Sequence, residues 1–292
     1  MTVSFLILNY KSYPDTIRVT NEILEFSVSQ FEYNIVIVDN KSPNDSFRVL
    51  RTTFLNNDKV SVIEAGSNAG YSKGNNLGLR YLQDKRPDYV CIMNNDVHFD
   101  ADVIARMIEL DGYIIDAAFF SPIQMLPNGE VAAFGSLRQP TFQDDIKSYL
   151  PILFTRNKKW NYFRSNKYNV QEVDIVPGAL LFIRYSKFER MGFFDESTFL
   201  FCEERFTSQR VKELGMKNYI VLDKTYIHEH SKTINAETSA LLQLKFLHNG
   251  KIAFTKKYRK NAEVKVFILN ILYHLKRIEL KTIIAFRRSR KK

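Results

Sequence analysis

Short apolar segments that recur near the N-terminus constrain the fold of this chain most strongly. They lie at residues 3–8, 35–38, 60–63 and 89–93. Segments with helical spacing separate or follow them, at residues 15–26, 44–55, 72–82 and 101–110. The apolar runs lack the alternation of a half-exposed strand, which is typical of strands covered on both faces. The sequence therefore predicts an α/β fold with a mainly parallel sheet and helices on both faces.

Polar side chains stand where three of these predicted strands end. Asn9 follows the first strand, Asp39 follows the second, and Asn94-Asn95-Asp96 follows the fourth. Open α/β sheets bind ligands at the carboxyl ends of their strands. A carboxylate such as Asp96 can help to hold Mg²⁺ or Mn²⁺ there, with phosphate oxygens completing the coordination shell. The alternative interpretation of this tip is a plain strand followed by an Asx turn.

The second half of the chain is less regular. Residues 136–172 are rich in Lys, Arg, Asn and aromatic residues. They are either a variable surface excursion or a flap that contacts an acceptor. Beyond them, the pattern predicts strands at residues 174–183 and 219–222, and helices at residues 186–191 and 203–214.

The net positive charge of the chain comes from its C-terminal part. The net charge is +10, but residues 245–292 hold 15 Lys and Arg against 2 Asp and Glu, whereas residues 1–244 hold 27 against 30. Within this part, six apolar residues share one helical face: Val264, Phe267, Ile268, Ile271, Leu275 and Ile278. A basic amphipathic helix of this kind suits an anionic membrane surface. Docking on the protein's own core, or on a second subunit to give a homodimer, is the alternative. No nucleic-acid partner is expected, because apolar residues between basic ones suit lipid better than a phosphate backbone.

The cysteines and the start of the chain bear on its compartment. Cys91 and Cys202 do not make a disulfide framework. The first residues enter a predicted strand at once, which leaves no room for a signal peptide. No apolar run reaches the length of a spanning helix. We expect a cytoplasmic protein that binds the inner face of the cell membrane peripherally.

Several short motifs occur along the chain in a fixed order. They are Asn9-Tyr10, Val38 to Ser42, Asn68 to Gly78, Asn94-Asn95-Asp96, Pro177-Gly178-Ala179, Phe194-Asp195-Glu196, Phe199 to Glu204 and finally His228. In this order and spacing they resemble the family-2 inverting glycosyltransferases of bacterial capsule, exopolysaccharide and O-antigen synthesis, including rhamnosyltransferase-like members. The resemblance covers residues 3–235. Each motif alone is weak, but the ordered set is specific.

This resemblance implies the GT-A fold, a Rossmann-like nucleotide-sugar-binding domain. Residues 1–240 would form it, with a nucleotide-binding half at 1–120 and an acceptor and catalytic half at 121–240. Residues 241–292 would be a basic amphipathic helical appendage. The implied reaction moves one sugar from a UDP- or dTDP-sugar to a hydroxyl of a lipid-linked oligosaccharide, by direct displacement with inversion.

The resemblance also implies roles for single residues. The nucleotide-sugar donor is expected at Asn9, Asp39, Asn68, Gly70, Lys73, Asn75, Asn95 and Asp96. The acceptor is expected at Gly178, Ala179, Asp195 and Glu196. The metal cofactor, Mn²⁺ or Mg²⁺, is expected on Asp96 and His228, where it would neutralise the leaving diphosphate. For the asparagines of the 68–78 motif, turn and helix-cap chemistry is the alternative.

Two departures from the family pattern bear on the chemistry. Asn94 stands where an acidic residue is usual, so Asp96 is the only carboxylate at the strand tip, and a metal should depend on donor phosphates. The family's Glu-Asp-x-Asp is here Glu203-Glu204-Arg205-Phe206. Removal of the acceptor proton needs a positioned base. Glu204 occupies the usual position of that base, and Glu203 is the alternative.

The sequence argues against two other functions. A nucleotidyltransferase on a related α/β fold should carry a glycine-rich phosphate loop after the first strand, but residues 9–12 read Asn-Tyr-Lys-Ser. A non-catalytic carbohydrate or membrane adaptor would have no need for Asp39, Asp96 and Glu204 together.

Overall fold

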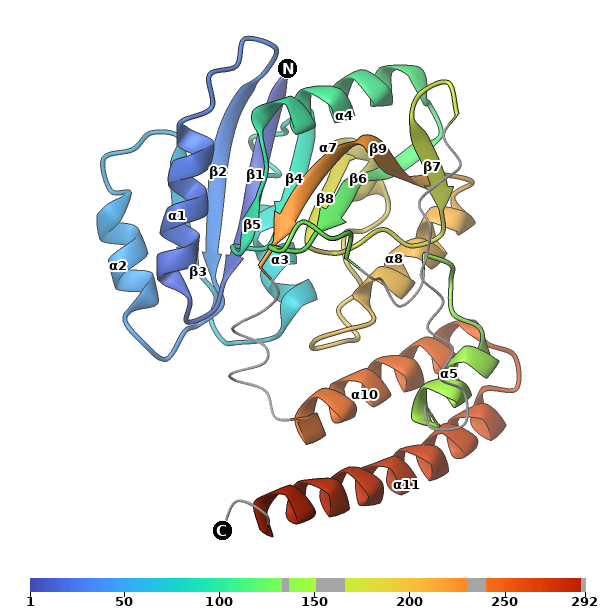
Figure 1. Cartoon of the computed structure of the whole chain (residues 1–292). Coiled ribbons are helices and arrows are strands. Elements are labelled where there is room, and N and C mark those ends of the chain that lie inside the picture. Colours follow the sequence, from blue (N-terminus) through green and yellow to red (C-terminus); the bar gives the residue numbers. More distant parts are fainter. Residues whose placement is uncertain (133–136, 151–165, 230–239, 290–292) are drawn as a thin grey trace.

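The computed structural model describes residues 1–132, 137–150, 166–229 and 240–289, and Figure 1 shows its sheet, the covering helices and a C-terminal helical hairpin. The nine strands are β1 (Thr2–Asn9), β2 (Glu32–Asp39), β3 (Val60–Glu64), β4 (Tyr89–Met93), β5 (Val97–His98), β6 (Ala117–Met125), β7 (Val170–Val173), β8 (Leu180–Arg184) and β9 (Lys217–His228). The helices are α1 (Tyr13–Leu24), α2 (Ser46–Thr53), α3 (Tyr71–Tyr81), α4 (Ala101–Tyr113), α5 (Phe142–Tyr149), α7 (Tyr185–Arg190), α8 (Glu203–Glu213), α10 (Ala240–Tyr258) and α11 (Ala262–Ser289). The prediction of an α/β fold is confirmed.

The sheet has the order β3-β2-β1-β4-β8-β6-β9-β5, and β7 pairs with β9. The four strands from β3 to β4 are parallel, as expected. Beyond β4 the sheet is mixed, because β8 enters it antiparallel to both β4 and β6. The mainly parallel pairing therefore describes the N-terminal half, and the C-terminal half contains strands of both directions.

Helices cover both faces of the sheet, as the alternation predicts. One buried cluster joins β1 and β2 to α1, α2 and α4 through side chains such as Phe5, Ile37, Val19 and Met107. The other cluster joins the opposite face to α3, α7 and α8. These two cores hold the strands and helices in fixed relative positions, and the polar residues at the strand ends lie at their edge.

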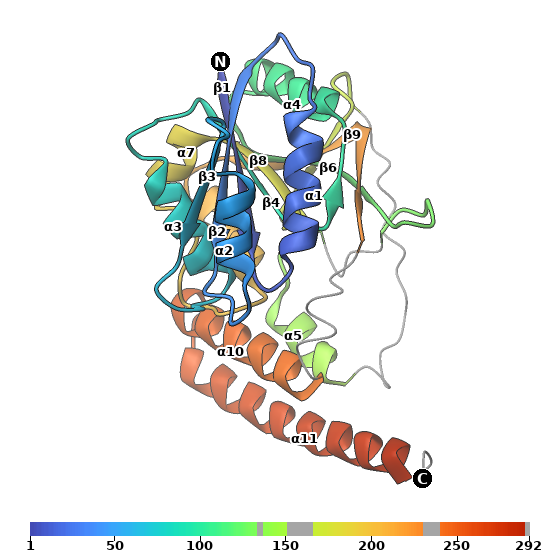
Figure 2. The same cartoon turned by 90° about the vertical axis from the view of Figure 1, so that its left-hand side faces the viewer.

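The C-terminal hairpin lies below the sheet, with α10 between α11 and the sheet, while α5 packs against α11 directly (Figures 1 and 2). The sequence pattern predicts α11, but it does not single out α10 or α5. In α11, Leu269 is fully buried and Tyr273 stacks on His248 of α10. Among the described residues, no helix is both long enough and apolar enough to cross a bilayer.

The apolar face predicted for α11 is turned away from α10. Five of its six residues are exposed in the described structure, at 46 to 65% of their surface: Val264, Phe267, Ile271, Leu275 and Ile278. These five side chains do not pack on the described core of this chain. Arg277 and Lys281 on the same helix are exposed as well.

Candidate active site

The ends of β1 and β2 carry the first two predicted site residues, and the structure brings them together. The parallel register places Asn9 opposite Asp39. The Asn9 amide donates to Asp39 Oδ2 over 2.7 Å, and Ser42 donates its backbone N–H and its hydroxyl to the same carboxylate, each over 2.8 Å. Both residues are fully buried. Because a carboxylate has about four acceptor positions, Asp39 keeps one for a further donor.

The tip of β4 is tied to this pair through α1. Asn95 donates to Thr16 Oγ1 over 2.9 Å, and Thr16 donates to Asn9 Oδ1 over 2.7 Å. Arg18 donates to the backbone carbonyl of Asn95 over 3.2 Å. Asn9, Asp39 and Asn95 therefore belong to one hydrogen-bonded network at the strand ends. The sequence motif did not reveal Thr16 as the residue that links them.

The loop before α3 is held by the residue that follows Asp39. Asn40 donates to Asn68 Oδ1 over 3.0 Å and to the carbonyl of Gly70 over 3.2 Å. Gly70 has φ of +92°, and a Cβ there would lie 2.0 Å from the carbonyl oxygen of Phe199. The glycine thus permits the close approach of another part of the chain, which a motif in one segment cannot reveal.

Three other residues of this motif differ in their surroundings. Lys73 is exposed. Asn75 is fully buried; it donates to the carbonyl of Tyr71, and its own Oδ1 has no hydrogen-bond partner among the described residues. Asn76 exchanges two hydrogen bonds with the backbone of Phe194, of 2.9 and 3.0 Å, and donates to Glu196 over 2.9 Å. Asn76 therefore fastens α3 to the turn that carries the predicted acceptor residues.

The expected metal ligands lie side by side. His228 Nε2 is 3.1 Å from Asp96 Oδ1, and both side chains are largely buried. On the other side of the ring, Gln124 Nε2 is 3.1 Å from His228 Nδ1, and Gln124 in turn accepts from the Tyr226 hydroxyl. A group that hydrogen-bonds the second ring nitrogen of a metal-binding histidine, as Gln124 does here, fixes the orientation of the imidazole. No group of three or more His, Cys, Asp or Glu that could hold a metal occurs in the described part of the chain.

The antiparallel pairing of β4 with β8 brings the tip of β4 to the predicted acceptor segment. Met93 lies opposite Leu180, and the backbone N–H of Asn94 donates to the carbonyl of Ala179 over 2.9 Å. Next to Ala179, a Cβ on Gly178 would lie 2.7 Å from Glu204 Oε1. Gly178 therefore gives room to the predicted base.

Glu203 and Glu204 begin α8 and line a small cavity of about 10 Å³, together with Tyr71, Gly178 and Ser208. That volume is about enough for one water molecule. Glu203 is 6% exposed, and its Oε2 has no hydrogen-bond partner in the described structure. Burial raises the pKa of both carboxyls, and the neighbouring Glu204 raises that of Glu203 further.

Tyr71 connects the donor loop with this pair of carboxyls. Its hydroxyl donates to the carbonyl of Gly178 over 3.0 Å. Burial raises the pKa of the Tyr71 phenol well above its usual value, and the carboxylates of Glu203 and Glu204 raise it further. The phenol therefore stays a hydrogen-bond donor. Tyr71 is a contact of the site that the sequence analysis did not single out, although it stands inside the 68–78 motif.

The two acidic residues predicted for the acceptor are engaged within the protein. Asp195 is 4% exposed and pairs with Arg210 over 3.0 Å and with Lys257 over 2.5 Å. Burial alone would raise the pKa of the Asp195 carboxyl, but hydrogen bonds from Lys257 and Ser197 lower it below its ordinary value. Glu196 accepts from Asn76, which lowers its pKa, and from Arg80. Glu196 is the more exposed of the two.

Parts of two earlier expectations fall outside the described residues. The excursion at 136–172 contains α5 and β7, while its residues 136 and 151–165 are outside the described ranges. His228 is described, and the residues from 230 to 239 that follow it are not.

Known proteins resemble this chain in sequence. The family model described as glycosyl transferase family 2 matches residues 4–189. The low-salt glycan biosynthesis hexosyltransferase Agl10 of Haloferax volcanii is 28% identical over 211 residues, which are 69% of this chain and 59% of Agl10. The rhamnosyltransferase WbbL of Escherichia coli is 25% identical over 65% of this chain and 70% of its own length. An N-acetylglucosaminyl-diphospho-decaprenol L-rhamnosyltransferase of Mycobacterium tuberculosis is 20% identical over 72% of this chain and 70% of its own length.

Solved structures resemble it in fold. GalNAc-T7 with UDP, GalNAc and Mn²⁺ superposes with a TM-score of 0.59 at 14% identity, over 78% of this chain and 44% of its own. The mannosyltransferase PcManGT of Pyrobaculum calidifontis, in complex with GDP-Man and Mn²⁺, has a TM-score of 0.59 at 14% identity, over 97% of this chain and 75% of its own. The prediction of a GT-A fold with a C-terminal helical appendage is confirmed.

Proposed function

Because the chain belongs to glycosyl transferase family 2, we propose that it is an inverting transferase that moves one sugar from a UDP- or dTDP-sugar to a hydroxyl of a lipid-linked oligosaccharide. One observation carries this proposal. The pairing of β4 with β8 brings the Asp96 tip and the Glu204 carboxylate to the same short segment, Gly178-Ala179. A group that holds a diphosphate and a group that accepts a proton are the two parts that the reaction needs.

The donor is proposed to bind at the strand ends. Asp39, with one acceptor position left, would take a hydrogen bond from the nucleotide, and the network through Asn9 and Asn95 would hold that carboxylate in place. The loop at Asn68 and Gly70 would lie beside the nucleotide. Lys73 and Asn75 follow on α3, and their proposed role is to contact the donor from that side.

A divalent cation would complete the donor site. Asp96 and His228 fit as two ligands for Mn²⁺ or Mg²⁺, and the diphosphate oxygens and water would supply the others, since the described chain offers no third acidic or imidazole ligand. When bound, the ion would act as a Lewis acid that stabilises the charge of the leaving diphosphate.

Glu204 is proposed to take the proton of the acceptor hydroxyl. Its raised pKa makes it a stronger base than an exposed carboxylate. The hydroxyl oxygen would then attack the anomeric carbon as the diphosphate leaves from the opposite face, which inverts the centre without a covalent sugar–enzyme intermediate. Glu203 is the alternative base. Gly178, Ala179 and Glu196 would line the acceptor, and Asp195 would contribute by ordering this segment.

The lipid-linked acceptor is proposed to be anchored in a membrane. The name of the mycobacterial relative includes N-acetylglucosaminyl-diphospho-decaprenol, in which a sugar is joined through a diphosphate to a long apolar alcohol. In this chain, the exposed apolar residues of α11 and the basic residues beside them would bind an anionic bilayer at the inner face of the cell membrane. The product would serve capsule, exopolysaccharide or O-antigen synthesis.

A thermal-shift and calorimetry panel tests the proposal. UDP, dTDP and GDP, and UDP-glucose, UDP-GlcNAc and dTDP-rhamnose, would each be titrated with Mn²⁺, with Mg²⁺ and with EDTA. We expect one nucleotide to stabilise the protein by a few kcal/mol at saturation and to bind more tightly with the cation present. The proposal fails when no nucleotide or nucleotide sugar binds under any of these conditions.

A further inference from the structure

One face of α10 lies along residues 195–206, the stretch that leads into Glu203 and Glu204. Phe246 of α10 stacks on Phe199 with ring centroids 4.8 Å apart. Two helical turns further on, Phe254 meets Phe206 edge to face at 5.3 Å. The spacing of these contacts matches the repeat of a helix face. Helix α10 therefore packs along one side of residues 195–206.

The tightest approach lies between these two aromatic contacts. A Cβ on Gly250 would lie 2.8 Å from Cys202 Cβ, 2.9 Å from its Sγ and 3.3 Å from the carbonyl oxygen of Phe201. Glycine in a helix interior is unfavourable compared with alanine. Its presence here therefore has a packing reason, because a larger residue would push α10 away from Cys202.

The backbone that Gly250 touches is in an uncommon conformation. Phe201 and Cys202 both have φ of +69°, and Cys202 is the N-cap residue that directly precedes α8. Non-glycine residues in this region persist only where their surroundings hold them. The direction in which α8 begins sets where Glu203 and Glu204 point, so the contact that holds Cys202 also sets the position of these carboxylates.

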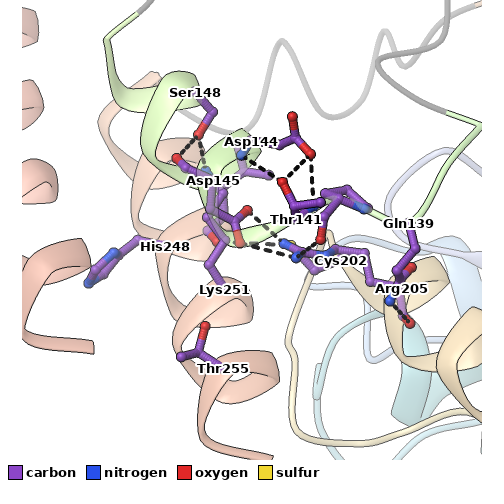
Figure 3. Close-up of polar contacts among 12 residues, drawn as sticks. Gln139, Thr141, Asp144, Asp145, Ser148, Cys202, Arg205, His248, Lys251 and Thr255 are labelled. Carbon is purple, nitrogen blue, oxygen red and sulfur yellow. Dashed lines mark hydrogen bonds and ion pairs between the residues drawn. The ribbon is translucent and has the colours of Figure 1, made fainter. Parts of the chain in front are cut away.

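Ion pairs hold the same junction from the side. Arg205 makes two hydrogen bonds to the Asp145 carboxylate of α5, of 2.9 and 3.1 Å, and Arg259 at the end of α10 binds Asp145 Oδ2 over 2.7 Å. Figure 3 shows Arg205 and Asp145 facing one another, with Cys202 and Lys251 close by. Lys251 donates to Ser148 of α5 over 2.6 Å. The start of α8 is therefore enclosed by α5 and α10.

We propose that Gly250 is a positioning residue for the transfer reaction: it lets α10 hold the turn at 201–202, and that turn holds Glu204 against Gly178. The proposal rests on the proposed function, because it assigns the base to Glu204. It makes α10 a part of the active-site structure, although α10 lies outside the matched region of the family model, which ends at residue 189.

Gly250→Ala is the direct test, and Gly112→Ala is its matched control. Gly112 lies inside α4, and a Cβ there would meet no atom within 4 Å. For Gly250→Ala we expect UDP or dTDP affinity and donor KM within about twofold of wild type and kcat lowered at least thirtyfold. Gly112→Ala should match wild type. The double variant Gly250→Ala/Cys202→Gly removes the two atoms nearest to the new Cβ and places glycine at a positive φ. Its kcat should therefore be at least tenfold higher than that of Gly250→Ala.

Further readouts separate positioning from general damage. Glu204 displaced from its half-buried position against Gly178 should titrate closer to an ordinary carboxylate, so the acid limb of the kcat profile should move to lower pH in Gly250→Ala. Reaction with a thiol reagent, mapped by mass spectrometry, should find Cys202 protected in wild type and accessible in the variant.

For Gly250→Ala, two results would overturn the proposal: a folded protein with kcat within threefold of wild type, or an equal loss of nucleotide affinity and of kcat. For the double variant, two results would do so as well: a kcat no higher than that of Gly250→Ala, or failure to fold. Should Gly250→Ala alone not fold, a folded and active double variant still supports the proposal. Absence of transfer by wild type with every donor would instead count against the proposed function, and the accessibility of Cys202 would still decide whether Gly250 sets the packing at this turn.

Discussion

His228 Nε2 and Asp96 Oδ1 lie 3.1 Å apart, although one residue ends β9 and the other follows β4. The contact exists because β5, which directly follows Asp96, pairs antiparallel with the end of β9, with Val97 opposite His228. The two-residue strand β5 thus brings His228 next to Asp96 in the proposed metal site.

Asp96→Ala should abolish transfer and leave the fold intact, because this side chain belongs to a strand tip and not to a hydrophobic core. We expect Mn²⁺ to strengthen nucleotide binding in the wild type, and the nucleotide to strengthen Mn²⁺ binding by the same factor. Asp96→Ala should lose most of this coupling, and His228→Ala part of it. Isothermal calorimetry measures both. Asp58→Ala, which changes an exposed carboxylate, is the control. Full activity in EDTA would contradict the metal role.

Glu204→Gln should lower kcat by about 10²–10⁴ with donor affinity nearly unchanged, because the amide keeps the shape but accepts no proton. Since burial raises the pKa of Glu204, the acid limb of wild-type kcat should lie above the ordinary carboxyl range. Steady-state kinetics over pH checks both. If Glu203→Gln shows this loss and Glu204→Gln does not, the base is Glu203; if neither does, no general base acts here.

Glu203→Gln should stabilise the fold at neutral pH. The pKa of Glu203 is raised in the folded state, so the folded protein binds this proton more tightly than the unfolded chain. Its favourable contribution is complete below the unfolded pKa and is lost as pH rises through the folded pKa. Removing the charge should therefore add about 1–3 kcal/mol above that pKa and little at pH 4. Denaturation by urea at several pH values measures this.

The control for that experiment is Glu213→Gln, an exposed position at the end of the same helix, which should be neutral at every pH. A lower stability of Glu203→Gln at pH 8 would contradict the assignment of a buried carboxylate with an unpaired oxygen.

Ile271→Glu/Leu275→Glu should weaken binding to anionic vesicles strongly, because both side chains belong to the exposed apolar face of α11. The electrostatic part of wild-type binding should amount to about 1 kcal/mol per Lys or Arg near the surface, and it should fade with salt. Co-sedimentation at low and high salt measures this. Ile115→Glu, at a residue 86% exposed outside the hairpin, is the control. If all forms sedimented equally with vesicles and only the α11 variant lost a dimer, the partner of the apolar face of α11 would be a second subunit and not a membrane.

Removal of residues 263–292 should spare nucleotide binding, since the proposed donor site is formed by the ends of β1, β2 and β4. It should lower activity on a lipid-linked acceptor more than on a soluble analogue. It would also uncover the side of α10 that carries His248, so some loss of thermal stability is expected, and the point variants above are the cleaner test.

Residues at the ends of parallel strands were predictable because strand order follows from the alternation of elements. Asn9, Asp39 and Asn95 gather for that reason. The roles of Gly70 and Asn76 were not predictable, because each faces a partner more than a hundred positions away, and nothing in the local sequence names that partner. The role of Gly178 was not predictable either, because its partner Glu204 belongs to a different motif.

The separate bounds of helix α10, inside the helical appendage predicted at 241–292, were not predictable for a related reason. Its apolar residues lie on more than one side, because it packs between the body and α11, so it lacks the single stripe by which a surface helix is recognised. The strong stripe of α11 was recognised, and it proved to be the face that this chain leaves exposed.

The layering of the hairpin has a geometric consequence. Helix α10 touches the stretch before Glu204 with one face and α11 with another, and α11 turns its apolar residues outward. A helix with its side chains is about 10–12 Å thick. If α11 rests on a bilayer, two stacked helices would hold Glu204, the proposed base, roughly 20 Å above the lipid surface. The hairpin would then set a minimum distance between the lipid surface and the hydroxyl that accepts the sugar.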